Sequence, residues 1–89
     1  MISVTMNGLN QYEVVVEHPV ETTHQVTLSP EYYRQLCASQ ITHEWLIIQA
    51  FKFLLEREPN TAILKQFDLA DISGYFPEFE TELKKRLGI

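Results

Sequence analysis

The stretch from residue 42 to residue 58, THEWLIIQAFKFLLERE, decides how this chain folds. At about 100° per residue it forms a helix whose apolar side chains cover roughly 220° of the circumference, whereas a surface helix needs little more than about 100°. The apolar positions are Leu46, Ile47, Ile48, Ala50, Phe51, Phe53, Leu54 and Leu55. Such a helix must be covered on more than one side, so we expect strands, other helices or a second copy of the chain around it.

The polar side of this helix is a narrow stripe. It consists of Gln49, Lys52 and Glu56, with Trp45 among them. Trp45 has two interpretations: it packs beneath the segment 59–74 or the final helix, or it anchors a contact surface, because tryptophan is enriched at interface hot spots. The stripe formed by Trp45, Gln49, Lys52 and Glu56 is therefore the candidate interaction surface.

The part of the chain before this helix, residues 1–28, predicts three antiparallel strands. Residues 2–6, 12–18 and 23–28 alternate apolar and polar side chains, and turn residues separate them. The phase of the first two strands requires a connection of three or five residues around Asn7-Gly8, because a one-residue slip would place apolar side chains opposite polar ones. Pairing Val16 with His24 keeps the inner side chains of the second and third strands on one face.

The rest of the chain, residues 29–89, predicts helices. We expect a short helix over 30–38 that begins at Ser29-Pro30-Glu31, a helical stretch over 61–67, a capped single turn at 68–71 and a final helix over 77–87. The expected fold class is α+β, a three-stranded antiparallel β-meander followed by three to four helices packed on one face. The helix over 42–58 is central, and residues 1–89 make one domain.

Charge and composition exclude several classes of partner. The formal net charge is −5, and no Lys or Arg occurs before Arg34. The first third of the chain would therefore be repelled by nucleic acid or by an anionic membrane. Cys37 is the only cysteine, so no internal disulfide can form. The sequence shows neither a secretory signal nor an apolar run of about 20 residues, and we expect a cytoplasmic protein without membrane contact.

No group of residues has the spacing of a catalytic, metal or cofactor site. The three histidines and Cys37 lack a close ligand pair such as Cys-x-x-Cys. The three glycines are scattered, so no loop can cradle a phosphate. Cys37 falls at an inward position of a short helix, where cysteine usually behaves as a small apolar residue. We expect no enzyme, no metal and no cofactor.

Residues 24–58 resemble the ribbon-helix-helix regulators, a family of dimeric DNA-binding proteins and antitoxins. The matching parts are the strand HQVTL (24–28), the segment SPEYYRQL (29–36) and a second helix that contains WLIIQAF (45–51) and ends in LLE (54–56). The resemblance implies that two copies pair these strands into a ribbon. Gln25 and Thr27 would then read DNA, while Val26 and Leu28 would face the core.

Two functions from different classes follow from these patterns. The first is a small non-enzymatic interaction or regulatory module, binding a protein partner or itself as a homodimer, because the wide apolar arc of the central helix calls for cover. The alternative is a DNA-binding regulator or antitoxin of the ribbon-helix-helix kind. The absence of basic residues on or before the strand at 24–28 favours the first.

Overall fold

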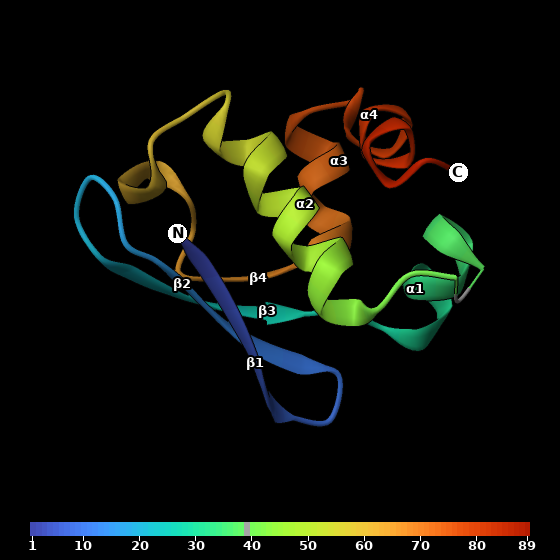
Figure 1. The fold of residues 1–89 in the computed structure, drawn as a ribbon, viewed down its shortest axis with the longest axis horizontal. Helices are drawn as coiled ribbons and strands as arrows, with labels where there is room; N and C mark the ends of the chain where they lie inside the picture. Colours follow the sequence, from blue (N-terminus) through green and yellow to red (C-terminus); the bar gives the residue numbers. More distant parts are fainter. Residues whose placement is uncertain (39) are drawn as a thin grey trace.

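The computed structural model describes residues 1–38 and 40–89, and these residues form the expected α+β fold. Three strands come first, β1 (Ile2–Gly8), β2 (Gln11–Val16) and β3 (Thr22–Thr27), and a short strand, β4 (Gln66–Asp68), follows much later. The α-helices are α1 (Pro30–Cys37), α2 (His43–Leu55), α3 (Ile72–Tyr75) and α4 (Phe79–Leu87), and the 3₁₀ turns are η1 (Asn60–Ala62) and η2 (Leu69–Asp71). The helices lie on one face of the sheet and leave its other face uncovered, and α1 and α4 lie at one end of the sheet (Figure 1).

The predicted meander is confirmed. β1 pairs with β2 and β2 pairs with β3, both antiparallel, and the strand order is β1-β2-β3-β4. Val14 lies opposite Val4 on one side and opposite His24 on the other, so alternate side chains share one face. The buried side chains on that face are Tyr12, Val14, Val16, His24 and Val26. The other face meets water, as alternating sequences predict.

The first hairpin turns at a different place from the one predicted. Leu9 and Asn10 form the turn instead of Asn7-Gly8, and Asn10 has a left-handed φ of 58°. A bulge after Met6 shifts the register by one residue. Five residues therefore separate the paired Met6 and Tyr12. The prediction of an odd-length connection is confirmed, but the position of the turn was wrong.

The second hairpin is shorter than predicted by two residues. Val16 pairs with Thr22 rather than with His24, and Val14 pairs with His24. The predicted register was therefore wrong. Because side chains alternate with a period of two, a shift by two residues leaves each of them on its predicted face. Alternation alone does not distinguish these two registers.

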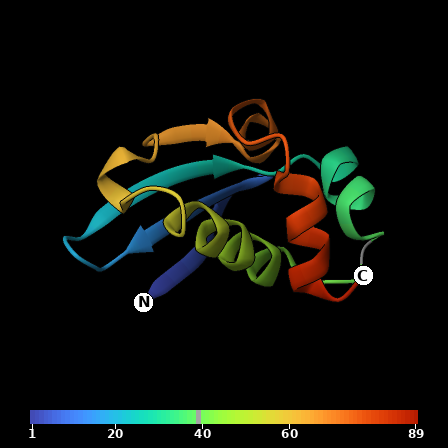
Figure 2. The same cartoon turned by 90° about the horizontal axis from the view of Figure 1, so that it is seen from above.

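The segment 61–67, predicted to be helical, instead leads from η1 into β4. β4 runs parallel to β3 and pairs Phe67 with Val26 (Figure 2). The Gln25 backbone N–H donates to the Lys65 carbonyl at 2.7 Å and extends this pairing. A parallel pair needs a long crossover rather than a tight hairpin, and this crossover contains α1 and α2. No local turn therefore marks β4 in the sequence.

Helix α2 begins where the sequence predicts and ends three residues earlier. The Thr42 hydroxyl accepts a hydrogen bond from the Trp45 N–H at 3.1 Å and caps the first turn. The helix stops at Leu55 instead of Glu58. Pro59 explains why Glu58 is outside the helix, because a proline disfavours helical backbone in the residue before it.

The apolar arc of α2 is covered on several sides, as expected. The buried apolar side chains are Leu46, Ile47, Ala50, Phe51, Phe53 and Leu54. β1 contacts one side of the helix and α4 contacts another. The Phe51 ring lies 6.0 Å from the Phe67 ring of β4, and the Phe53 ring lies 5.1 Å from the Phe79 ring of α4. α2 is thus the centre of the core.

Candidate interaction surfaces

The four residues predicted as an interaction surface do not share one environment. Trp45 is 46% exposed, and the Lys52 ammonium lies 5.9 Å from the centre of its ring. Gln49, in the turn between them, is only 8% exposed. Glu56 is exposed but forms an ion pair with Arg86. The structure therefore brings Trp45 and Lys52 together at the surface and separates the other two from them. Within the single chain, Trp45 is not a core residue.

Glu56 belongs to a charged cluster that joins the end of α2 to α4. Its carboxylate accepts a hydrogen bond from the Arg86 guanidinium, and this bond lowers the pKa of Glu56 and raises that of Arg86. The neighbouring Arg57 donates to the Glu78 carboxylate at 3.2 Å and lies over the Phe53 ring at 3.6 Å. These charges therefore hold two helices together.

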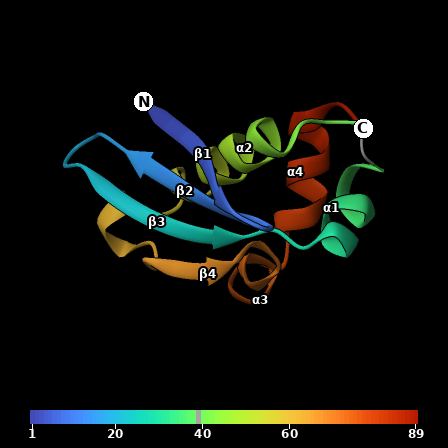
Figure 3. The ribbon, with the colours of Figure 1, turned by 90° about the horizontal axis from the view of Figure 1, so that it is seen from below.

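The outer side of β1 is an unpaired sheet edge (Figure 3). The Met1 carbonyl accepts from the Glu17 N–H at 3.2 Å, so the odd-numbered residues of β1 bond to β2. The peptide groups of Ile2, Val4 and Met6 consequently point away from the sheet. No strand in the described part of the chain pairs with them. The first charged side chain in the sequence is Glu13, so β1 itself is uncharged.

Apolar side chains continue from this edge onto α2. Met1 is 79% exposed and Met6 is 55% exposed. A shallow hollow lies between the start of β1 and the solvent side of α2, and its lining includes Ile2, Ile48, Lys52 and Leu55. We call the backbone edge of residues 2–6, together with Met1, Ile48, Lys52 and Leu55, the β1 surface. It connects the open edge with the exposed side of α2 that carries Trp45.

His24, which is buried, forms hydrogen bonds within the fold through both ring nitrogens. His24 is 1% exposed, and its Nδ1 lies 2.8 Å from the Leu64 carbonyl, which can only accept, so this nitrogen carries the proton. Its Nε2 lies 2.8 Å from the Thr22 hydroxyl. The Asn60 side chain donates to the same hydroxyl at 2.9 Å and to the Val20 carbonyl at 2.6 Å. This chain of hydrogen bonds ties β3 to the segment that leads into β4.

A second group of polar side chains lies near the start of α2. His43 Nδ1 is hydrogen-bonded to the Tyr12 hydroxyl, and its ring lies edge-on to Tyr33 at 4.0 Å. Burial raises the pKa of Tyr12 and that of Tyr33. The Cys37 thiol is buried and donates to the Tyr33 carbonyl at 3.4 Å. Within residues 1–38 and 40–89, no three metal-binding side chains gather at one place.

The residues that the ribbon-helix-helix resemblance assigns to DNA reading lie on the uncovered face of the sheet. Gln25 and Thr27 are half-buried there, and Gln25 accepts a hydrogen bond from the Asn7 side chain at 2.8 Å. A two-chain ribbon needs a free edge on this strand, but β3 is paired with β2 on one side and with β4 on the other. β3 therefore offers no free edge at which a second copy could form this ribbon, and the DNA-reading role of Gln25 and Thr27 stays a prediction.

Comparisons with known proteins do not add a family. No protein-family model, no curated protein and no solved structure matches this chain. Among the helices that the structure describes, none has both the length and the apolar character that crossing a membrane requires.

Proposed function

We propose that this protein is a non-enzymatic interaction module that works as a homodimer, in which β1 strands of two copies pair antiparallel. The observation that carries the proposal is the open edge of β1. Exposed edges pair readily with another strand, and proteins usually protect them with short length, proline or charged side chains. β1 is seven residues long and contains neither a proline nor a charge.

The sequence of β1 is self-complementary about Val4. When two copies run antiparallel with Val4 opposite Val4, Ile2 meets Met6 and Ser3 meets Thr5. Apolar side chains then face each other on the inner side of the sheet, and hydroxyls face each other on the outer side. The same register aligns the free peptide groups, because the residues that point outward are 2, 4 and 6 in each copy. A twofold interface requires this self-complementarity.

The positions of the histidines and of Cys37 in the fold support the non-enzymatic part of the proposal. Both ring nitrogens of His24 are bonded within the fold, and Cys37 is buried. His43 is held by Tyr12 and does not line the hollow of the β1 surface. His18 does line it, but its companions among the described residues there are apolar side chains and Lys52, without a carboxylate, a hydroxyl or a thiol beside it. An active site would need such groups at a concave surface where a substrate can reach them.

Sedimentation equilibrium over a concentration series tests the dimer, and Met6→Pro is the decisive variant. Proline lacks the N–H, but at this position the N–H points away from β2, so the β1–β2 ladder keeps its bonds. We expect the wild-type protein to change from monomer to dimer mass with rising concentration. Met6→Pro should stay monomeric where the wild type is dimeric.

Met6→Leu is the matched control, because it keeps both the N–H and an apolar side chain of similar size. It should dimerise as the wild type does. A wild-type protein that stays monomeric into the millimolar range would end the proposal. A Met6→Pro variant that dimerises normally would show that the contact lies elsewhere.

The alternative function, DNA binding, is tested by a gel shift with duplex DNA at low salt. Glu13, Glu17, Glu21 and Glu31 all precede Arg34, the first Lys or Arg of the chain. Affinity for DNA depends largely on neutralising phosphates. We therefore expect no shift, and a salt-sensitive shift would favour the alternative.

A further inference from the structure

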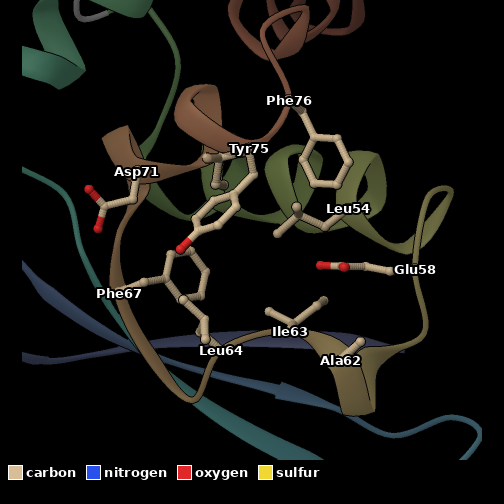
Figure 4. A pocket seen from close by; sticks show the side chains of 10 residues that line it. Leu54, Glu58, Ala62, Ile63, Leu64, Phe67, Asp71, Tyr75 and Phe76 are labelled. Carbon is tan, nitrogen blue, oxygen red and sulfur yellow. The ribbon is translucent and has the colours of Figure 1, made fainter.

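A second apolar site lies beside β4, at the edge of the sheet opposite β1. It is a pocket of about 180 Å³ between the second half of α2, the segment 58–64, β4 and α3 (Figure 4). Its wall is made by the apolar side chains Leu54, Ile63, Leu64, Phe67, Ile72 and Phe76. The pocket is thus an apolar recess that the fold leaves open.

Two carboxylates and one tyrosine lie around this recess. The Glu58 side chain points inward from one side, Asp71 lies on the other side with its carboxylate directed away from the recess, and the Tyr75 ring lies between them (Figure 4). Tyr75 is 68% exposed and Leu64 is 52% exposed, so the apolar lining continues to the surface. Of the described residues that line the pocket, none is basic.

Both carboxylates are available to an external cation. The ion pairs formed by Arg57 and Arg86 involve Glu56 and Glu78. Within the described ranges, neither Glu58 nor Asp71 forms an ion pair. Asp71 uses one oxygen to accept the Asp68 N–H at 3.2 Å, in the cap of η2, and the residue stays exposed. A positive charge placed at the mouth would therefore be attracted by two acidic groups.

We propose that the pocket receives one apolar side chain of a partner protein, and that Glu58 binds a lysine or arginine of the same segment at its mouth, while Asp71 on the opposite side adds to the negative charge. Sites that enclose a small molecule usually measure about 300–1,000 Å³. A volume of about 180 Å³ suits one side chain better than a whole ligand. The apolar wall provides affinity, and the carboxylates select against acidic segments. The inference does not depend on the dimer, because β1 and β4 are opposite edges of the sheet.

Titration of the full chain with capped dipeptide amides, followed by backbone amide NMR shifts, tests this site. The probes are acetyl-phenylalanyl-lysine amide, acetyl-phenylalanyl-glutamate amide and acetyl-glycyl-lysine amide. We expect the first probe to shift the amides of Leu64, Phe67 and Tyr75. The second should bind several-fold more weakly at the same place because its charge is repelled, and the third should leave these amides unchanged.

The double variant Glu58→Gln with Asp71→Asn tests the role of charge without emptying the pocket. The asparagine can still accept the cap hydrogen bond, so the variant keeps the fold. Removing both carboxylates should weaken the lysine probe by about two- to five-fold, as for a surface ion pair with Glu58, and should remove the preference over the glutamate probe. The control is Glu17→Gln with Glu31→Gln, which removes the same charge at exposed positions outside the pocket. It should leave the preference intact.

Three results would overturn the proposal. One is that no probe shifts the pocket amides. Another is that the lysine and glutamate probes bind the wild type equally well. The third is that the pocket amides shift with protein concentration alone, which would mean that a second copy fills the recess. Dimerisation is tested separately, by sedimentation of the Met6→Pro variant, so either proposal can fail without the other.

Discussion

The two edges of the sheet are built differently, although both belong to one small domain. β1 offers an uncharged edge over seven residues, with three peptide groups directed at solvent. β4 is three residues long, lies between Lys65 and η2, and ends in Asp68. Short length and nearby charge are common protections against strand pairing. The comparison indicates that the β1 edge is suited to pairing with another strand, while the β4 edge is suited to recognising side chains.

The edges also differ in how the rest of the chain holds them. β1 is joined to β2 by a local hairpin, and one of its faces packs against α2. β4 has no hairpin, so it depends on distant contacts: its pairing with β3, the contact of its Phe67 with Phe51, and the hydrogen bond between His24 and Leu64 just before the strand. Changes to the core should therefore disturb β4 more than β1.

The largest effect is expected from Phe51→Ala. Phe51 is fully buried between His24 at 5.4 Å and Phe67 at 6.0 Å, measured between ring centres. Loss of a buried phenylalanine side chain costs about 3–5 kcal/mol, and here it also removes the support of β4. Denaturant unfolding measures the loss. Leu9→Ala, at a side chain that is 90% exposed, should change stability by less than about 0.5 kcal/mol. A loss below about 1 kcal/mol for Phe51→Ala would contradict the central place of α2.

An intermediate effect is expected from His24→Leu. Leucine fills the space but leaves the Leu64 carbonyl without its donor, which should cost about 1–3 kcal/mol. Amide hydrogen exchange should become faster at residues 66–68 and stay unchanged at the β1–β2 ladder. Thr23→Leu, on the exposed face of the same strand, is the matched control and should leave exchange at both places unchanged. Equal acceleration at both edges would refute the view that they are held independently.

The smallest effect is expected from Glu56→Gln, which lies away from both edges. The hydrogen bond from Arg86 lowers the pKa of Glu56 below its usual 4.5. A carboxyl group with a lowered folded-state pKa stabilises the fold above its unfolded pKa, and this contribution disappears as the pH falls through the folded value. The variant should therefore lose less stability than the wild type between pH 7 and about pH 3. Urea unfolding at both pH values measures this, with Glu17→Gln as the control. Equal losses in Glu56→Gln and the wild type would show that the ion pair does not contribute.

The parts of the fold that could be predicted are those with a local signal. β1, β2 and β3 alternate in polarity, and α2 has a cap, a wide apolar arc and a proline after its end. β4 has none of these signals: it has three residues, and its parallel partner lies far away in the sequence. Ile63 and Leu64 before the strand and Phe67 within it also fit the spacing of a helix, so the segment was predicted as helical.

The sites were less predictable than the fold for a related reason. Lys52 was placed at the surface because helical spacing puts it on the polar stripe, whereas the same spacing left open whether Trp45 packs beneath a later segment or lies at a contact surface. The same spacing placed Gln49 there, although packing buries it. The pocket beside β4 combines residues from five separate elements, including a strand that the sequence did not reveal. The open edge of β1 depends on strand order, which residue patterns do not specify.

The position of β4 has a consequence for the growing polypeptide. β4 covers the side of β3 that faces away from β2, yet it lies about forty positions further along the chain. While the protein is being made, the meander is complete before the strand that shields it exists. A nascent chain that ends before Gln66 therefore has two unpaired outer strands, β1 and β3, instead of β1 alone. The last third of the sequence thus supplies the cover that the first third needs.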